Sequence, residues 1–183
     1  MAYKRFKWSL ISVVVLGSIF FTAWAGGTRR ITAASTDTLT AAPQMGYRMP
    51  PFTLPVLGSN ETISTAKLTG KPIFINFWTS WCTYCRLEAP DVEKAYKKYG
   101  NKVVFLSVNV TSQDSMPAIQ AFAQQFGMTW KIPLDTTGAV AQKYQIIAFP
   151  TSFFVDRAGL IEDKVVGALS PGTLNADLEA ISK

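Results

Sequence analysis

The sequence contains no histidine and only two cysteines among its 183 residues. Without histidine, there can be no catalytic pair in which an imidazole activates a serine or a cysteine. Two thiolates also fall short of the four Cys or His ligands that a structural zinc ion usually takes. We therefore expect neither a metal ion nor another cofactor, so any chemistry should depend on the two cysteines.

Acidic residues are missing from the start of the chain, where the first is Asp37. The net charge of +6 arises largely there, because five of the 18 basic residues lie within the first 30 positions. The rest of the chain is close to neutral and has no basic stripe, which excludes the electrostatic pattern of a nucleic-acid-binding protein.

An uncharged run of 21 residues lies between Lys7 and Arg29. About 20 apolar residues are needed to cross a bilayer, and Trp8 and Trp24 stand near the two ends, where indole rings favour the interface. Basic residues slightly favour the N-terminal flank, which predicts a cytoplasmic N-terminus. We expect residues 1–30 to be a single-pass anchor in the cell membrane, with the catalytic domain on the extracytoplasmic side.

A cleaved signal peptide is the alternative for this leader, because Ala23-Trp24-Ala25 has the small-x-small pattern of a cleavage site. With either alternative, the rest of the chain is exported from the cytoplasm. Residues 31–48 are rich in Thr, Ala and Ser, which predicts a flexible tether. Residues 49–183 are then expected to form one domain.

Hydrophobic patterning in this domain predicts an α/β fold with a mixed central β-sheet and helices on both faces. Gly and Pro residues separate the predicted elements. Strands are expected at 52–56, 73–78, 103–110, 151–155 and 160–166, and helices at 83–99, 117–126, 139–144 and 171–181.

The two cysteines form the motif Cys82-Thr83-Tyr84-Cys85, directly after a predicted buried strand and at the start of a helix. Unpaired N–H groups and the positive end of the helix dipole stabilise a thiolate at that position. Cys85 lies about one turn later and can attack a mixed disulfide formed at Cys82. We expect Cys82 to be the exposed, attacking thiol and Cys85 the shielded, resolving thiol.

Two other uses of the motif fit the sequence less well. A purely structural disulfide between residues three apart closes a very small loop and therefore stabilises little. Covalent haem attachment requires His after the second cysteine, and this position is Arg86.

The stretch Phe77-Trp-Thr-Ser-Trp-Cys-Thr-Tyr-Cys85, the leader, Glu88 and Phe149-Pro-Thr151 together resemble the ResA/TlpA-like thiol-disulfide oxidoreductases of the thioredoxin family. The resemblance covers residues 49–183. It implies a thioredoxin-like fold with an N-terminal strand extension and a central insertion, here residues 109–135.

The resemblance also implies roles for single residues. Glu88 would accept and donate protons for the cysteine pair, although a solvated helix Glu is the plainer alternative. Pro150 would form the cis-proline loop facing the cysteines, rather than an ordinary turn, and the backbone near Phe149 would bind a substrate peptide. Trp81 is expected on the apolar surface around the site. Asn76 stands where thioredoxins carry a buried Asp, which shifts proton transfer toward Glu88.

The expected function is extracytoplasmic reduction of client protein disulfides, with electrons from a membrane-embedded donor protein. The resemblance implies that clients include the Cys-x-x-Cys-His segment of apocytochrome c. A disulfide-forming oxidase would use the same residues, because direction depends on reduction potential. A peroxidase, a copper carrier and a non-enzymatic binding module are further alternatives, of which the copper carrier is disfavoured by the missing histidine.

Overall fold

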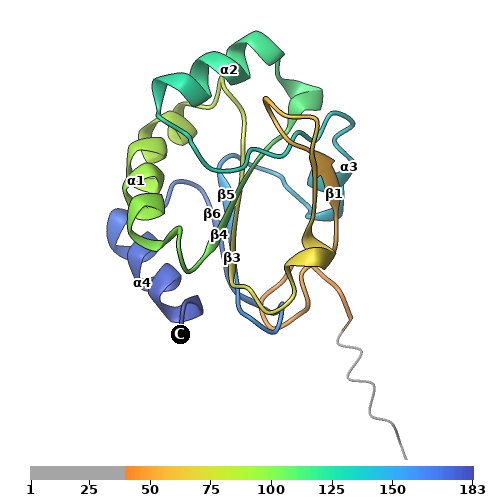
Figure 1. Cartoon of the computed structure of the whole chain (residues 1–183), viewed down its shortest axis with the longest axis vertical. Helices are drawn as coiled ribbons and strands as arrows, with labels where there is room; N and C mark the ends of the chain where they lie inside the picture. The colour runs from red at the N-terminus through yellow and green to blue at the C-terminus, as the bar shows by residue number, and fades with distance from the viewer. Residues whose placement is uncertain (1–39) are drawn as a thin grey trace, which may run out of the picture. The chain divides into compact units, whose positions relative to one another are not determined.

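The computed structural model describes residues 40–183, whose centre is a four-stranded sheet in the order β4-β3-β5-β6 (Figure 1). Strand β3 (Ile73–Trp78) is parallel to β4 (Val104–Asn109) and antiparallel to β5 (Thr151–Val155). Strand β6 (Ile161–Val166) pairs antiparallel with β5. The mixed sheet is therefore as the sequence predicts, and the fold is thioredoxin-like.

Both faces of the sheet are covered, and β3 contributes to both because successive side chains point in opposite directions. Ile73, Ile75 and Phe77 pack on the face covered by α3 (Ala139–Lys143) and strand β1 (Thr53–Pro55). Phe74 packs on the opposite face, where α1 (Thr83–Tyr99) and α4 (Pro171–Ile181) lie. All six residues of β3 are buried, which explains why its sequence is a continuous apolar run with little alternation.

The remaining elements are short. Strand β1 (Thr53–Pro55) pairs antiparallel with β2 (Thr62–Ser64) in a separate two-stranded sheet. Strand β2 and the two 3-10 helices, η1 (Thr65–Leu68) and η2 (Thr111–Gln113), are not predicted from the sequence, because three or four residues are too few to establish a hydrophobic period. Helix α2 (Met116–Gln125) begins one residue before its predicted start.

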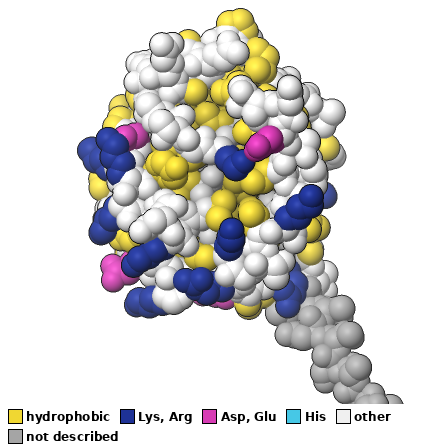
Figure 2. Space-filling view, viewed as in Figure 1, with side chains coloured by type: hydrophobic (Ala, Val, Ile, Leu, Met, Phe, Trp, Pro, Cys, Tyr) yellow, Lys and Arg dark blue, Asp and Glu magenta, His cyan; other side chains and the backbone are white. Residues whose placement is uncertain are grey.

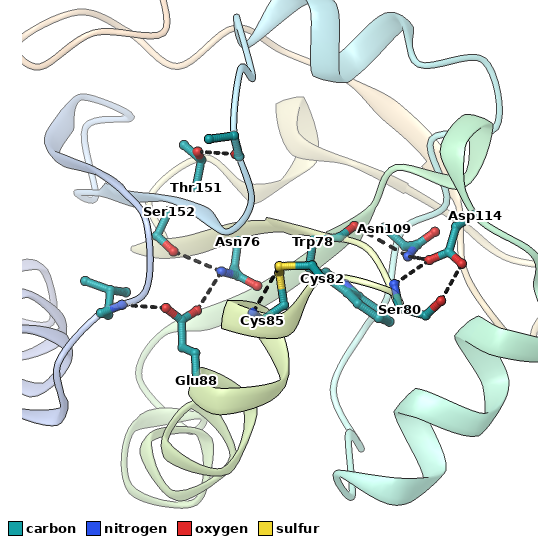
Figure 3. Close-up of a disulfide and its surroundings, with 12 residues drawn as sticks. Asn76, Trp78, Ser80, Cys82, Cys85, Glu88, Asn109, Asp114, Thr151 and Ser152 are labelled. Atoms are coloured by element: carbon teal, nitrogen blue, oxygen red, sulfur yellow. Dashed lines mark hydrogen bonds between the residues drawn. A yellow bond between two sulfur atoms is a disulfide. The ribbon is translucent and has the colours of Figure 1, made fainter.

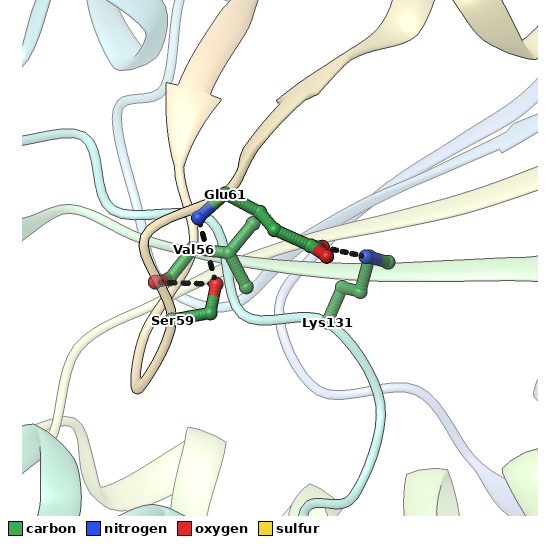
Figure 4. A network of polar contacts seen from close by, with 4 residues as sticks. All are labelled: Val56, Ser59, Glu61 and Lys131. Carbon is green, nitrogen blue, oxygen red and sulfur yellow. Dashed lines mark hydrogen bonds and ion pairs between the residues drawn. The ribbon is translucent and has the colours of Figure 1, made fainter.

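The insertion joins β4 to the N-terminal extension. Within it, Lys131 and Leu134 bridge to β4, and Pro133 bridges to Val56 at the end of β1. The salt bridge between Lys131 Nζ and Glu61 Oε2, 3.0 Å long, adds a contact beside the turn between β1 and β2 (Figure 4). The insertion therefore covers the edge of the sheet that β4 would otherwise expose.

Paired backbone extends upstream of residue 49, which corrects the expected boundary between tether and domain. Ala41 and Arg48 bridge to each other, and Arg48 bridges to Leu160. Gly46 N donates a hydrogen bond to Ile161 O at 2.8 Å, so this segment is held beside the start of β6. The predicted anchor at 1–30 and the first part of the tether lie outside the described residues. Within residues 40–183, no helix combines the length and hydrophobicity that crossing a membrane requires.

Candidate active site

The Cys82–Cys85 pair lies where β3 ends and α1 begins, and the two sulfurs form a disulfide. Cys82 is the N-cap residue of α1, and its Sγ accepts a hydrogen bond from Cys85 N at 3.0 Å (Figure 3). This is one of the backbone N–H groups that a helix start leaves unpaired. The sulfur of Cys82 therefore occupies a position that favours a negative charge, as the sequence predicts.

The two cysteines do not differ in exposure in this oxidised state. Cys82 is 5% exposed and Cys85 is 4% exposed. The expectation that Cys82 is exposed and Cys85 shielded is therefore wrong for the disulfide form. Phe149 packs against the cluster that contains both cysteines, and this contact helps to explain the equal burial.

Glu88 is buried one turn beyond Cys85, with only 3% of its surface exposed. Its Oε1 accepts a hydrogen bond from Asn76 Nδ2 at 3.0 Å, and its Oε2 accepts one from Leu169 N at 2.6 Å. Asn76 Nδ2 also donates to Ser152 Oγ at 3.0 Å, so Asn76 on β3 links the Glu88 carboxyl on α1 to Ser152 on β5 (Figure 3). A solvated helix Glu, the plainer alternative, does not fit this environment.

Burial raises the pKa of Glu88 to about 7, although hydrogen bonds from Leu169 and Asn76 act to lower it, and the charge of Asp91 adds a small increase. A carboxyl with this pKa is partly protonated at neutral pH and can both accept and donate a proton. Glu88 and Cys85 also line one small pocket of about 10 Å³, close to the room that one water molecule needs.

The loop before β5 brings the expected substrate-contacting residues to the disulfide. The Phe149–Pro150 peptide bond is cis. The rings of Phe149 and Trp81 meet edge to face with their centroids 5.8 Å apart. Trp81 is held in this position by a hydrogen bond from its Nε1 to Gln113 O at 2.8 Å. The structure thus brings Trp81, Phe149 and the cysteine pair together from separate loops.

Four large apolar side chains are more than half exposed on the segments that carry or flank these residues. They come from the loop before Cys82, the first turns of α1 and the loop before Pro150, and are Trp81, Tyr84, Leu87 and Ile147. Figure 2 shows apolar and uncharged atoms across the end of the molecule where α2 lies, whereas Lys and Arg side chains are frequent toward the other end. Such an apolar surface is typical of protein-binding sites.

A second group of polar residues, which the sequence analysis missed, holds the loop between β3 and Cys82. The Asp114 carboxylate accepts hydrogen bonds from Ser80 N at 2.6 Å and from Ser80 Oγ at 2.5 Å (Figure 3). Asn109 Nδ2 donates to the same carboxylate at 2.9 Å. Ser80 and Asp114 are 34 positions apart, so no local sequence pattern could have connected them.

Comparison with known proteins agrees with this geometry. A model of the AhpC/TSA family matches residues 45–164, most of the described domain. The chain belongs to the AhpC/TSA family. Thioredoxin-like protein YneN from Bacillus subtilis is 35% identical over 137 residues, which are 74% of this chain and 79% of YneN.

Other relatives carry a more specific description. Thiol-disulfide oxidoreductase ResA from Bacillus cereus is 26% identical over 173 residues, which cover 94% of each chain. A secreted disulfide oxidoreductase from Mycobacterium tuberculosis is 25% identical, with a TM-score of 0.65 over 70% of this chain and 95% of that chain. Together with the Cys82–Cys85 disulfide, these relatives identify the protein as a thiol-disulfide oxidoreductase.

Proposed function

We propose that this protein reduces disulfides in exported client proteins, with Cys82 as the attacking thiol and Cys85 as the resolving thiol. The observation that carries the proposal is the buried Glu88 carboxyl, with a pKa of about 7, in the same pocket as Cys85. Resolution of a mixed disulfide requires Cys85 to lose its proton, and a nearby group that titrates near neutral pH can take it.

The cycle begins with both cysteines reduced. The Cys82 thiolate attacks one sulfur of the client disulfide, the client S–S bond breaks, and the departing client thiolate takes up a proton. Cys85 then passes its proton to Glu88 and attacks Cys82 Sγ, which expels the second client thiolate. Two electrons have moved to the client, and the protein is left with the Cys82–Cys85 disulfide. A two-electron donor in the membrane then restores the dithiol.

Clients would bind across the surface made by Trp81, Phe149 and Pro150. The two rings offer apolar contact beside the disulfide. The backbone next to the cis Phe149–Pro150 bond would pair with an extended client segment, in the manner of strand addition. The favoured client is the Cys-x-x-Cys-His segment of apocytochrome c before haem attachment. The resemblance to the ResA-like branch implies this client, and the relatives named thiol-disulfide oxidoreductase ResA support the place of the chain in that branch.

The proposed location is the outer side of the cell membrane, with residues 1–30 as the anchor. The support is the uncharged run of 21 residues between Lys7 and Arg29. Protease treatment of intact cells and of inverted membrane vesicles tests this location. Digestion of the domain in intact cells is the expected result, and protection there combined with digestion in inverted vesicles would contradict it.

Two measurements test the direction and the roles. The Cys82–Cys85 couple, equilibrated against dithiothreitol or glutathione buffers, should have a reduction potential near or below about −270 mV, the value of thioredoxin. A potential near about −120 mV, the value of a strong periplasmic oxidant, would instead make the protein a disulfide donor.

The second measurement assigns the two cysteines. Cys85→Ser should accumulate a mixed disulfide between Cys82 and a peptide that carries an oxidised Cys-x-x-Cys-His motif. Cys82→Ser is the matched control and should accumulate none. Trapping by Cys82→Ser but not by Cys85→Ser would reverse the assignment.

A further inference from the structure

The loop that delivers Cys82 is fastened to the beginning of the insertion. Besides the three hydrogen bonds from Ser80 and Asn109 described above, Asp114 Oδ1 accepts one from Ser115 N at 2.8 Å. Four donors therefore converge on one carboxylate, which lies between η2 and α2. Figure 3 shows the three bonds from Ser80 and Asn109. Charge-assisted hydrogen bonds of this kind are stronger than neutral ones, so the contact is an effective clamp.

Further contacts secure the same loop on both sides of Ser80. Val110 N donates to Trp78 O at 3.1 Å, and Trp81 Nε1 donates to Gln113 O at 2.8 Å. Residues 78, 80 and 81 are thus all bonded to the segment 110–114, immediately before Cys82.

The loop itself is a tight turn, because Cys82 N donates to Thr79 O at 3.3 Å. Ser80 lies inside this turn, so its two bonds to Asp114 fix the approach of Cys82 to the start of α1. Moving Ser80 would shift Cys82 Sγ relative to the N–H group of Cys85 that it faces.

The clamp also places a permanent negative charge beside Ser80, two residues before Cys82. Burial acts to raise the pKa of Asp114, but the hydrogen bonds from Ser80, Asn109 and Ser115 outweigh it and hold the pKa below its usual value. Two other charged groups are near. Glu88 lies on the far side of Cys85, and Arg86 on α1 donates to Gln125 and lies over the Phe122 ring of α2.

We propose that Asp114 is a positioning residue for disulfide exchange, which holds the Ser80 turn in place and makes the Cys82–Cys85 couple more reducing. The proposal rests on the exchange function proposed above. Reduction of the disulfide takes up two electrons and two protons and yields two thiols, and the Cys82 thiol then releases its proton to become the nucleophile. A fixed negative charge disfavours the Cys82 thiolate, and with it the reduced state, so the equilibrium shifts toward the disulfide.

The test uses the full chain in a non-ionic detergent and the variant Asp114→Asn. This change removes the charge while retaining the size of the side chain. At fixed ratios of oxidised to reduced glutathione, the dithiol-to-disulfide ratio of the variant should rise roughly tenfold. Alkylation of the reduced protein by iodoacetamide should show Cys82 ionising at lower pH than in the unmodified chain.

Asp135→Asn is the matched control. Asp135 is a buried carboxylate of the same insertion, but its Oδ2 accepts a hydrogen bond from Ala141 N at 2.8 Å, in α3, rather than from the loop before Cys82. The control should be less stable yet keep the glutathione equilibrium and the alkylation profile. A purely structural effect of losing a hydrogen-bonded carboxylate from the insertion would move both variants alike, and this result would overturn the proposal.

Ser80→Ala separates position from charge and serves if Asp114→Asn fails to fold. It removes the 2.5 Å bond from Ser80 Oγ but leaves the carboxylate in place. The expected result is a severalfold lower kcat for reduction of an oxidised peptide, with the glutathione equilibrium unchanged. An unchanged kcat in Ser80→Ala would overturn the positioning role. An unchanged glutathione equilibrium in Asp114→Asn would overturn the electrostatic role. Failure of the unmodified chain to exchange with glutathione at all would instead refute the proposed function.

Discussion

Replacement of Glu88 by glutamine should remove a pH dependence from the stability of the domain. In the folded state the pKa of Glu88 is about 7, against an ordinary value of 4.5. Because the folded state holds the proton more tightly than the unfolded state, Glu88 contributes stability that is fully present below about pH 4.5. That contribution is lost as the pH rises through about 7, where the buried carboxyl must ionise.

The size of the loss follows from the shift. A change of one pKa unit corresponds to about 1.4 kcal/mol, so the contribution amounts to roughly 3 kcal/mol between pH 4.5 and pH 8. The amide of the Glu88→Gln variant would not ionise, so this part of the slope should vanish. The amide also offers one acceptor oxygen to the two donors, Asn76 Nδ2 and Leu169 N. This mismatch lowers the free energy of unfolding at every pH, so it does not produce a dependence of that free energy on pH.

Urea unfolding of the oxidised full chain in non-ionic detergent, repeated at several pH values from 4.5 to 8, measures the effect. The free energy of unfolding of the unmodified protein should fall relative to the variant as the pH rises. Glu93→Gln is a suitable control, because Glu93 lies on the same helix and its carboxylate forms an ordinary ion pair with Lys97 at 2.7 Å. Parallel pH profiles for the unmodified protein and Glu88→Gln would refute the reasoning.

Three further changes probe other parts of the domain. Asn76→Asp would place a second carboxyl 3.0 Å from Glu88 and should raise an apparent pKa of the pair by at least about one unit. The pH profile of peptide reduction measures this pKa, and an unshifted profile would contradict the network described here. Tyr144→Phe removes a buried 2.7 Å hydrogen bond to Pro50 O and should lower the free energy of unfolding by about 1–2 kcal/mol in urea titrations. An unchanged free energy of unfolding would mean that the bond does not stabilise the domain. Glu61→Ala breaks an exposed ion pair and should cost only about 0.5 kcal/mol, so a loss above about 2 kcal/mol would show that the insertion depends on it.

The elements around the cysteines could be predicted because their signals are local. The apolar run Ile73–Trp78, the cysteines after it and Gly100 at the helix end together predict a strand followed by a helix, and α1 has the predicted bounds. Glu88 could be singled out because the resemblance to the ResA/TlpA-like branch implies its role, and it lies three positions, about one helical turn, after Cys85. Its burial could not, since it depends on Leu169 and Ser152, which come from distant parts of the chain.

The parts that could not be predicted depend on long-range contacts. No motif connects Ser80 with Asp114, and only the fold places Ser80 N 2.6 Å from the Asp114 carboxylate. The expected difference in exposure between the cysteines is wrong for the disulfide form, in which Phe149, far along the chain, packs against the cluster that contains both. Upstream, Gly46 pairs with Ile161, although its composition suggested a tether. Backbone pairing does not depend on side-chain chemistry, so composition alone gave no signal.

The hydrogen bond from Asn76 to Glu88 helps to explain how a buried carboxyl can still titrate near neutral pH. Burial alone would keep the Glu88 carboxyl protonated at neutral pH, because desolvation strongly disfavours the charged form. Asn76 and Leu169 supply two N–H donors that stabilise the carboxylate, and the balance leaves the pKa at about 7. An Asp at position 76 would add a second negative charge next to the Glu88 carboxylate. Asn76 has no charge, and its Nδ2 donates hydrogen bonds that hold both Glu88 and Ser152 in place. This arrangement places one group that titrates near neutral pH in the pocket that Cys85 also lines, which is what the proposed resolving step requires.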